Sequence, residues 1–310
     1  MRSLPNLSVQ QLDYLVAVHE APTWADAAAA VGVSPSALSQ GLAELERRLG
    51  VTLFARDGRR RVPTEAAAVV LDHAQAVLAR TQDLARWAER RRQGTTGAVR
   101  VGMIDAAATI HCAAGLAAFR ASRPDVALRL QVSPSGELLR DLVAARLDVA
   151  VAVAPAVLPA GVTAVPLLDE ELAVYAPAGG PPDAWGPWVT YPVGSRTREL
   201  VHDALRRAGR PVAVVAESHQ PEVLAQMVAL GLGWAVLPEA QVERSGVALR
   251  RVGADPFARR ALVIARRADG PADPTVDALI SVLAAGSGAL TPDPAARTGS
   301  ASRAGPRAAG

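Results

Sequence analysis

The sequence contains no lysine and only one cysteine, Cys112, in 310 residues. A single cysteine excludes an internal disulfide and fits a reducing compartment. The chain opens without a basic-then-apolar signal segment, and no apolar run is long enough to span a membrane. We therefore expect a cytoplasmic protein that has no membrane partner.

Aromatic residues are also scarce, at 4% of the chain, while half of the residues are hydrophobic and 20% are charged. This composition favours globular cores built from Ala, Val and Leu and argues against disorder. The length predicts two or three domains. The net charge of +3 says little, but six arginines against one acid between Arg47 and Arg61 indicate a local phosphate contact.

The first fifty residues carry the spacing of three helices. Residues 9–20 form the first, and Thr23 is placed to cap a second that ends at Gly32. Ser34 caps a third, with Pro35 at its first position. Small residues, a tight turn and a capped polar helix start are what a helix-turn-helix requires to enter the major groove of DNA. An ordinary helical hairpin is the alternative reading.

A hairpin and a long helix are expected next. Residues 51–63 predict strand, turn and strand, with Asp57-Gly58 as the turn signal. A helix then runs from Pro63-Thr64-Glu65 to about Arg92. Its small and apolar residues follow the rhythm of a helix pair: Val70, Ala74, Val77, Thr81, Leu84 and Ala88.

From Ala98 onward the pattern alternates between strands and helices, which predicts a parallel sheet covered on both faces. The first unit comprises strand 99–104, helix 109–122, strand 126–132, helix 136–146 and strand 149–154. The second comprises strand 171–175, helix 196–208, strand 212–216, helix 221–230 and strand 234–237. Residues 247–284 supply a further strand and a closing helix, and the aperiodic residues 287–310 are expected to be a disordered tail.

One run of residues resembles the N-terminal signature of LysR-type transcriptional regulators. Its members are Ala27-Ala28, Ser34, Ser39, Leu45-Glu46, Leu49-Gly50, Leu53-Phe54 and Arg56, followed by Arg59-Arg60-Arg61-Val62-Pro63-Thr64. With the domain order behind it, the resemblance covers residues 8 to about 285. It implies an α+β multidomain protein: a winged helix-turn-helix, a long linker helix, and two α/β subdomains like those of periplasmic binding proteins.

The resemblance also assigns residues to DNA binding. Recognition-helix positions are taken by Ser34, Pro35, Ser36 and Ser39, and wing positions by Arg56, Arg59, Arg60 and Arg61; the polar start of the same helix adds Gln40. Gln40 can reach a base edge, while the arginines would contact the backbone or the minor groove. Gly41 departs from the family, which usually has a larger residue there. We expect this glycine to cost about 1 kcal/mol of helix propensity and to remove a DNA contact.

An effector is expected in the cleft between the two α/β subdomains, at the carboxyl ends of strands and at helix N-termini. The residues assigned to it are Asp105, Ala106, Thr109, Ser133, Ser135, Gly136, Ser195, Arg196 and His219. Asp105 stands where relatives often have a small hydroxyl, so it favours an effector with an amino or hydroxyl group, or else merely caps the next helix. Arg196 could receive a carboxylate or be an ordinary surface arginine.

Catalytic and metal-binding patterns are missing from the sequence. The five histidines have no metal-ligand spacing, and no phosphate-binding loop, nucleophile elbow or paired catalytic carboxylates occur. Cys112 beside His111 suggests either a reactive thiol or a small buried residue, and the buried residue is favoured. We expect no cofactor, no metal and no enzymatic activity.

The sequence therefore predicts a ligand-responsive regulator with four segments. Residues 1–63 form the DNA-binding domain, 64–94 the linker and dimerisation helix, and 95–286 the effector-binding domain, ahead of the tail. Subdomain I is placed at about 95–165 and 247–286, and subdomain II at about 166–246. The expected partners are double-stranded operator DNA, a small-molecule metabolite and further copies of the chain, as a dimer or tetramer. An architectural DNA binder without effector, or an enzyme with an α/β substrate domain, are the rival interpretations.

Overall fold

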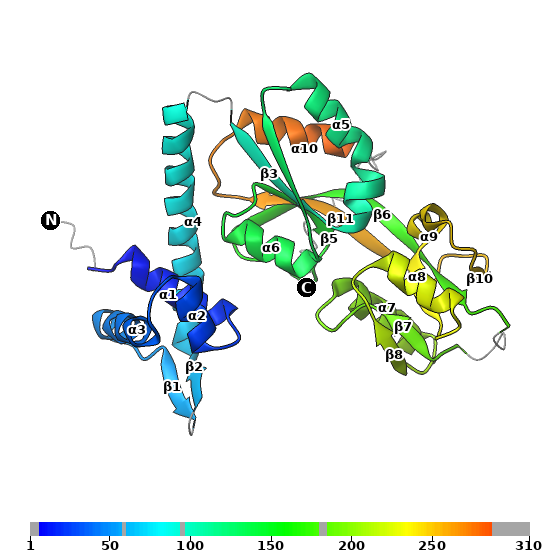
Figure 1. Ribbon diagram of the computed structural model, residues 1–310, viewed down its shortest axis with the longest axis horizontal. Helices are drawn as coiled ribbons and strands as arrows, with labels where there is room; N and C mark the ends of the chain where they lie inside the picture. The colour runs from blue at the N-terminus through cyan, green and yellow to red at the C-terminus, as the bar shows by residue number, and fades with distance from the viewer. Residues whose placement is uncertain (1–5, 58–59, 94–96, 180–184, 287–310) are drawn as a thin grey trace, which may run out of the picture.

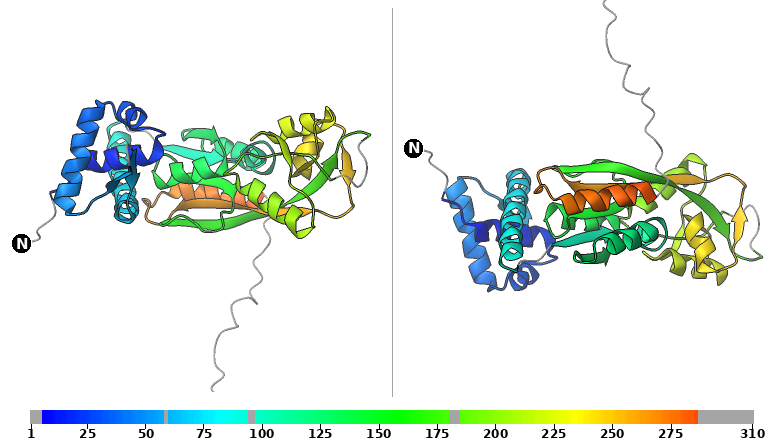
Figure 2. Two further views of the ribbon diagram at one scale, coloured as in Figure 1. Left: turned by 90° about the horizontal axis from the view of Figure 1, so that it is seen from below. Right: turned by 90° about the horizontal axis from the view of Figure 1, so that it is seen from above.

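The structure is a computed structural model that describes residues 6–57, 60–93, 97–179 and 185–286. Gly58, Arg59 and the expected tail at 287–310 lie outside these residues, as does the side chain of Arg60. The molecule is elongated, with a helical N-terminal domain and two α/β subdomains in a row (Figures 1 and 2). Among the described residues, no helix is long and apolar enough to cross a membrane.

The N-terminal domain consists of α1 (Val9–Glu20), α2 (Trp24–Ala30), α3 (Pro35–Leu49) and the antiparallel pair β1 (Phe54–Asp57) and β2 (Arg60–Pro63). The predicted caps are confirmed, because the hydroxyls of Thr23 and Ser34 accept from the backbone N–H of Asp26 and Ala37. The leucine stripe of α3 is buried against α1 and α2. Helix α3 is thereby fixed by its apolar face, which leaves its polar start at the surface.

A single helix, α4 (Glu65–Gln93), connects this domain to the rest of the molecule (Figure 1). Thr64 caps it by accepting from the N–H of Ala67 at 3.3 Å. The predicted apolar stripe divides into two parts: Ala74 is buried in the N-terminal core, whereas Val77 and Leu84 are exposed, as is Trp87. The middle and end of α4 therefore present an apolar surface to solvent.

A seven-stranded sheet runs through both α/β subdomains. Its strands are β3 (Ala98–Met103), β4 (Ala127–Val132), β5 (Val149–Val153), β6 (Val162–Ala176), β9 (Ala235–Pro238), β10 (Arg250–Val252) and β11 (Ala258–Arg267). Strands β3, β4 and β5 lie in the first subdomain, and β9 and β10 lie at the far end of β6 in the second. The predicted parallel pairing is confirmed for β3, which lies between β4 and β5 and runs parallel to both. The rest of the sheet differs from the expected parallel arrangement, because β11 pairs antiparallel with β5 and β6, and β6 pairs antiparallel with β9 and β10. Helices α5 (Ala113–Ser122) and α10 (Pro274–Gly286) lie on one side and α6 (Ser135–Val143) on the other (Figure 1).

The second subdomain contains α7 (Arg196–Arg207), α8 (Pro221–Ala229), α9 (Glu239–Ser245) and the parallel strands β7 (Trp188–Thr190) and β8 (Val214–Glu217). Strand β6 is much longer than the predicted 171–175 and, with its partner β11, runs through both subdomains. The acidic run Asp169–Glu171 interrupts its apolar pattern, which is why the sequence did not reveal the earlier part of this strand.

Other elements also differ from the expected ones. A π-helical turn, η1 (Ala107–His111), precedes α5, so the predicted helix at 109–122 is broken at Cys112. Strand β7 and helix α9 were not predicted, since each is short. Strand β10 pairs with residues 174–176 of β6, so the chain returns to the first subdomain with β11 and not at Val247.

Candidate nucleic-acid interface and ligand cavity

The start of α3 displays the predicted polar residues. Ser34, Pro35, Ser36 and Gln40 are exposed, and Ser39 is half-buried. Two of these hydroxyls are also used locally, because Ser34 caps the helix and its Oγ lies 2.9 Å from that of Ser36. Gln40, one turn further along, offers an exposed amide that can form two hydrogen bonds to an adenine edge.

The hairpin is held against the helices by Arg61. Its Nη1 donates to Ser39 Oγ at 3.2 Å, and its guanidinium lies 4.7 Å from the centre of the Trp24 ring. Trp24 in turn meets Phe54 edge-on at 5.1 Å. These contacts fix a cation beside α3 before any partner binds, which reduces the entropy lost on binding.

Arg56 and Arg61 are direct cross-strand neighbours in this hairpin, and both are exposed. Like charges placed opposite each other on two strands destabilise a sheet. A phosphate between them would relieve that repulsion through charge-assisted hydrogen bonds. The geometry of the wing therefore suits a polyanion.

The structure corrects the expectation that Gly41 removes a DNA contact. A Cβ at this position would lie 2.6 Å from two ring carbons of Tyr14, so the glycine faces α1 and not the solvent. The residue permits a close crossing of α1 and α3 and removes no DNA contact. The family signature has a similar structural basis at Glu46, whose Oε1 accepts from the N–H groups of Leu53 and Phe54.

A cavity of about 440 Å³ lies between the two α/β subdomains, within the size range of small-molecule sites. Eight of the nine predicted effector residues line it: Asp105, Ala106, Ser133, Ser135, Gly136, Ser195, Arg196 and His219. Thr109 does not line it, because it points its hydroxyl back to the Asp105 carbonyl at 2.9 Å. The N-termini of α6, α7 and α8 all open onto this cavity.

Asp105 is not a helix cap in this structure. Its carboxylate accepts from Gln241 Nε2 of α9 at 2.9 Å, so it bridges the first subdomain to the second. Sequence reasoning missed Gln241 because α9 itself was not predicted. It also missed Tyr191, Thr197 and Arg260, which line the same cavity.

Arg260 belongs to a buried charge network behind the cavity. Its guanidinium lies 2.6 Å from Glu170 Oε2 and donates to Thr197 Oγ1 at 2.9 Å. His111 Nε2 lies 2.8 Å from the other Glu170 oxygen. Burial opposes the charge on Glu170, but His111 and Arg260 hold the pKa of its carboxyl below its ordinary value. The network joins η1, β6, β11 and α7, and therefore both subdomains.

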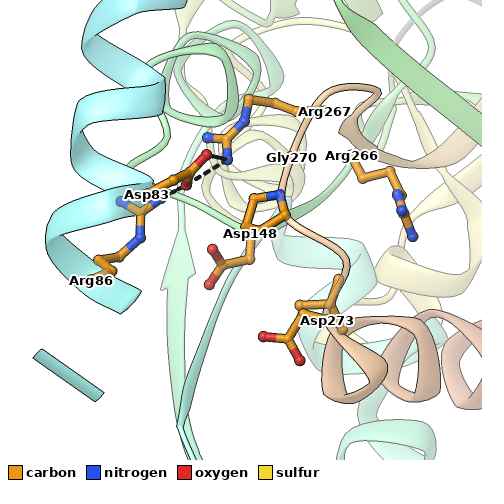
Figure 3. Close-up of a pocket in the computed structure, with 9 residues that line it drawn as sticks. Asp83, Arg86, Asp148, Arg266, Arg267, Gly270 and Asp273 are labelled. Atoms are coloured by element: carbon orange, nitrogen blue, oxygen red, sulfur yellow. Dashed lines mark hydrogen bonds and ion pairs between the residues drawn. The ribbon is translucent and has the colours of Figure 1, made fainter. Parts of the chain in front are cut away.

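The linker helix is attached to the first subdomain by a second set of ion pairs. Both Asp83 oxygens accept from Arg267 Nη2 at 2.9 Å, and Arg86 pairs with the same carboxylate (Figure 3). Arg86 also donates to the carbonyl of Ala145 at 2.8 Å. Ala145 has a φ of 55°, which a non-glycine residue rarely adopts. The end of α6 is therefore held at the linker helix.

Two family descriptions match this chain in the order that the geometry suggests. Residues 9–68 match "Bacterial regulatory helix-turn-helix protein, lysR family", and residues 92–287 match "LysR substrate binding domain". The chain belongs to the LysR family. LysR-type proteins are transcriptional regulators with a DNA-binding and an effector-binding domain, and this chain contains both.

Individual LysR-type relatives cover most of the chain. A probable hydrogen peroxide-inducible genes activator of Streptomyces viridosporus is 32% identical over 84% of this chain and 88% of its own length. IlvY of Salmonella typhimurium, a transcriptional activator, is 28% identical over 77% and 85%. The structure aligns with a full-length OxyR variant of Pseudomonas aeruginosa at a TM-score of 0.56, with 25% identity over 90% and 95%. CbnR in complex with its target DNA shares the fold, at a TM-score of 0.54 and 19% identity over 89% and 99%.

The thiol of this LysR-family chain is unsuited to peroxide chemistry, although some relatives are named as probable hydrogen peroxide-inducible genes activators. Cys112 is buried, and burial raises the pKa of its thiol to about 11. A protonated thiol is a poor nucleophile, and one cysteine in the whole chain cannot form an internal disulfide. The preference for a small buried residue over a reactive thiol agrees with this environment.

Proposed function

We propose that this LysR-family regulator reads an operator with α3 and the wing, and that a small metabolite in the cavity between the subdomains controls that binding. Under this proposal residues 1–63 bind DNA, 64–94 link and dimerise, and 95–286 bind the effector. It acts in the cytoplasm, as the single buried cysteine suggests, and it regulates transcription without catalysing a reaction.

The observation that carries this proposal is the position of α6. Gly136 and Arg140 line the effector cavity and also a groove of about 500 Å³ on the side of the linker helix α4. Helix α6 is thus the element that an effector and the linker helix both contact. An effector that stabilises one position of α6 would bias the angle of α4, and hence the spacing of two DNA-binding domains.

Pairing of two chains through α4 completes the proposal. The exposed apolar side chains of this helix lie on one stripe: Val69, Val77, Leu84 and Trp87. Burying such a stripe against a second copy is favourable, at roughly 25 cal/mol per Å². A pair of helix-turn-helix units would then contact two half-sites of a palindromic operator.

The test is fluorescence-anisotropy binding to the DNA upstream of the protein's own gene, with scrambled DNA of equal length as control and at several salt concentrations. We expect tighter binding to the upstream DNA and a loss of affinity with salt. Gln40→Ala should remove about 1–3 kcal/mol of the discrimination. Gln82→Ala, on the exposed surface of α4, is the matched control and should change nothing.

Two outcomes would contradict the assignment. Equal affinity for upstream and scrambled DNA, unaffected by Gln40→Ala, would favour an architectural DNA binder. No binding to either DNA would overturn the reading of α3 as a recognition helix.

A further inference from the structure

One corner of the cavity carries a negative charge with no cation beside it. Among the described residues Asp105 forms no ion pair, and its carboxylate accepts from the neutral amide of Gln241. Glu222 lies beside Asp105 and supplies no cation: burial, and then the neighbouring Asp105 carboxylate, raise the pKa of Glu222, which favours its neutral form. A partly buried carboxylate without a counter-charge is costly, so this corner gains most from a ligand that supplies the missing cation.

Two buried polar atoms at the cavity wall are also without partners. Gln241 is 2% exposed, and its Oε1 has no hydrogen bond although its Nε2 donates to Asp105. Tyr191 is 4% exposed, and its hydroxyl has none either. Burial raises the pKa of Tyr191 to about 12, so its hydroxyl stays protonated and can donate. Buried polar groups in native proteins are nearly always paired, and both residues line the cavity.

Groups suited to an anion lie elsewhere on the same walls. Arg140 and Arg196 line the cavity together with the start of α6 at Ser135 and Gly136, and the pair that Arg196 forms with Glu199 is more exposed than the pair formed by Arg260. Arg260 lines it too, but Glu170 already neutralises that guanidinium. The backbone N–H groups at a helix N-terminus attract a carboxylate. The cavity is therefore acidic in the corner of Asp105 and favourable to anions near α6 and α7.

We propose that the effector is a small amine of the amino-acid type, whose ammonium group binds Asp105 and the free Oε1 of Gln241. This inference rests on the proposed function, because it names the ligand class of the same cavity. The carboxylate of the effector faces Arg196 and the N-termini of α6 and α7. A bare anion would leave Asp105 without a counter-charge, and a hydroxyl would donate a hydrogen bond without neutralising it.

The experiment uses the full-length protein and each of the twenty L-amino acids, with the 2-hydroxy acid of the same side chain as a matched probe. Binding is measured by calorimetry and by the shift of the thermal midpoint. We expect at least one amino acid to bind, and its 2-hydroxy counterpart to bind roughly 10- to 100-fold more weakly, as loss of a charged hydrogen bond implies.

Variants then test the residues. Asp105→Asn should lower the affinity for the amino acid by a similar factor. The affinity for the 2-hydroxy acid should stay nearly unchanged. Asp255→Asn, an exposed carboxylate outside the cavity, should have no effect. The comparison of amino and hydroxy acids needs no variant, so it decides the question even if Asp105→Asn fails to fold.

Three results would overturn the inference: no amino acid binds, the hydroxy acid binds equally well, or Asp105→Asn leaves amino-acid affinity intact. Binding to the upstream DNA is measured on the same preparation. Retained specific DNA binding, with a response to a 2-hydroxy acid only, would reject the amine and keep the proposed function.

Discussion

The two ends of the molecule handle their polar groups in opposite ways. At the DNA-binding end, Ser34 caps α3 and Ser39 accepts from Arg61, so these groups are paired before DNA arrives. In the cavity, Tyr191 and Gln241 each keep a buried polar atom without a partner. Water can satisfy an exposed group at the DNA-binding end, whereas a buried atom in the cavity depends on the protein or on a ligand.

This difference predicts that the two regions select their partners to different degrees. The wing offers Arg56 and Arg61 to any phosphate, so its contribution is mostly independent of sequence. The cavity combines an unbalanced carboxylate with unpaired buried atoms, and a site of that kind rejects analogues that lack the matching group. We expect broad affinity from the first region and narrow chemical selection from the second.

The largest expected effect comes from breaking the charge network behind the cavity. Arg260→Met leaves Glu170, which is 4% exposed, with His111 as its remaining partner. Removing one member of a buried ion pair costs about 3–5 kcal/mol, and His111 should keep the loss near the lower value. Urea unfolding should show a less stable effector domain, with the N-terminal core unchanged because its hydrophobic cluster is separate from that of the first α/β subdomain.

The control for this variant is Glu170→Leu combined with Arg260→Met, which should recover part of the lost stability because no charge remains unpaired. Acid titration gives a second readout. Because the pKa of Glu170 is lowered from an ordinary value of 4.5, its contribution is present above pH 4.5 and is lost as the pH falls through the lower folded value. A double variant as unstable as the single one would contradict the role of the ion pair.

The sequence predicted the DNA-binding end more completely than the cavity, and the reason is physical. Helix caps, the leucine stripe and the turn signals act between neighbours in the chain, so α1 to α3 could be assigned from spacing. Arg260 and Glu170 meet only because β6 and β11 pair across 90 residues. Gln241 and Asp105 are separated by 136 residues in the sequence, so the pattern of neighbouring residues cannot predict their contact.

The cavity residues that were predicted share one property. Asp105, Ser133 and Ser195 follow strands or precede helices, and the rule that ligands bind at the carboxyl ends of strands locates such positions. Thr109 lies in the π-helical turn that replaces the start of the predicted helix, and its hydroxyl donates to the Asp105 carbonyl, so it is not among the residues that line the cavity. The rule predicts at which edge of the sheet a ligand binds, but not which side chains at that edge point into the cavity.

A smaller effect should follow from disconnecting the two regions. Asp83→Asn keeps the shape of the side chain but removes the charge that Arg267 and Arg86 share. Weakening hydrogen bonds to charged groups costs about 1.5–3 kcal/mol. We expect little change in operator affinity without effector and a clear loss in the ability of the effector to alter it, measured by anisotropy.

The matched control for this connection is Asp203→Asn, which also removes a carboxylate paired three residues away, but at the surface of α7. Exposed pairs of this kind contribute about 0–1 kcal/mol. If Asp83→Asn retained the full effector response, α4 and the first subdomain would not be coupled through this ion pair.

The smallest effect concerns Gly41, where two principles predict opposite signs. Helix propensity alone predicts that Gly41→Ala stabilises α3 by about 1 kcal/mol. The added Cβ would lie 2.6 Å from two ring carbons of Tyr14, which is 7% exposed, and overpacking of that kind costs about 1–3 kcal/mol. We expect packing to prevail, with a net loss of about 1 kcal/mol in thermal unfolding. Ala43→Gly, at an exposed position of the same helix, provides the reference for propensity alone. A stabilised Gly41→Ala would show that the Tyr14 ring moves at little cost and that the crossing of α1 and α3 does not require glycine.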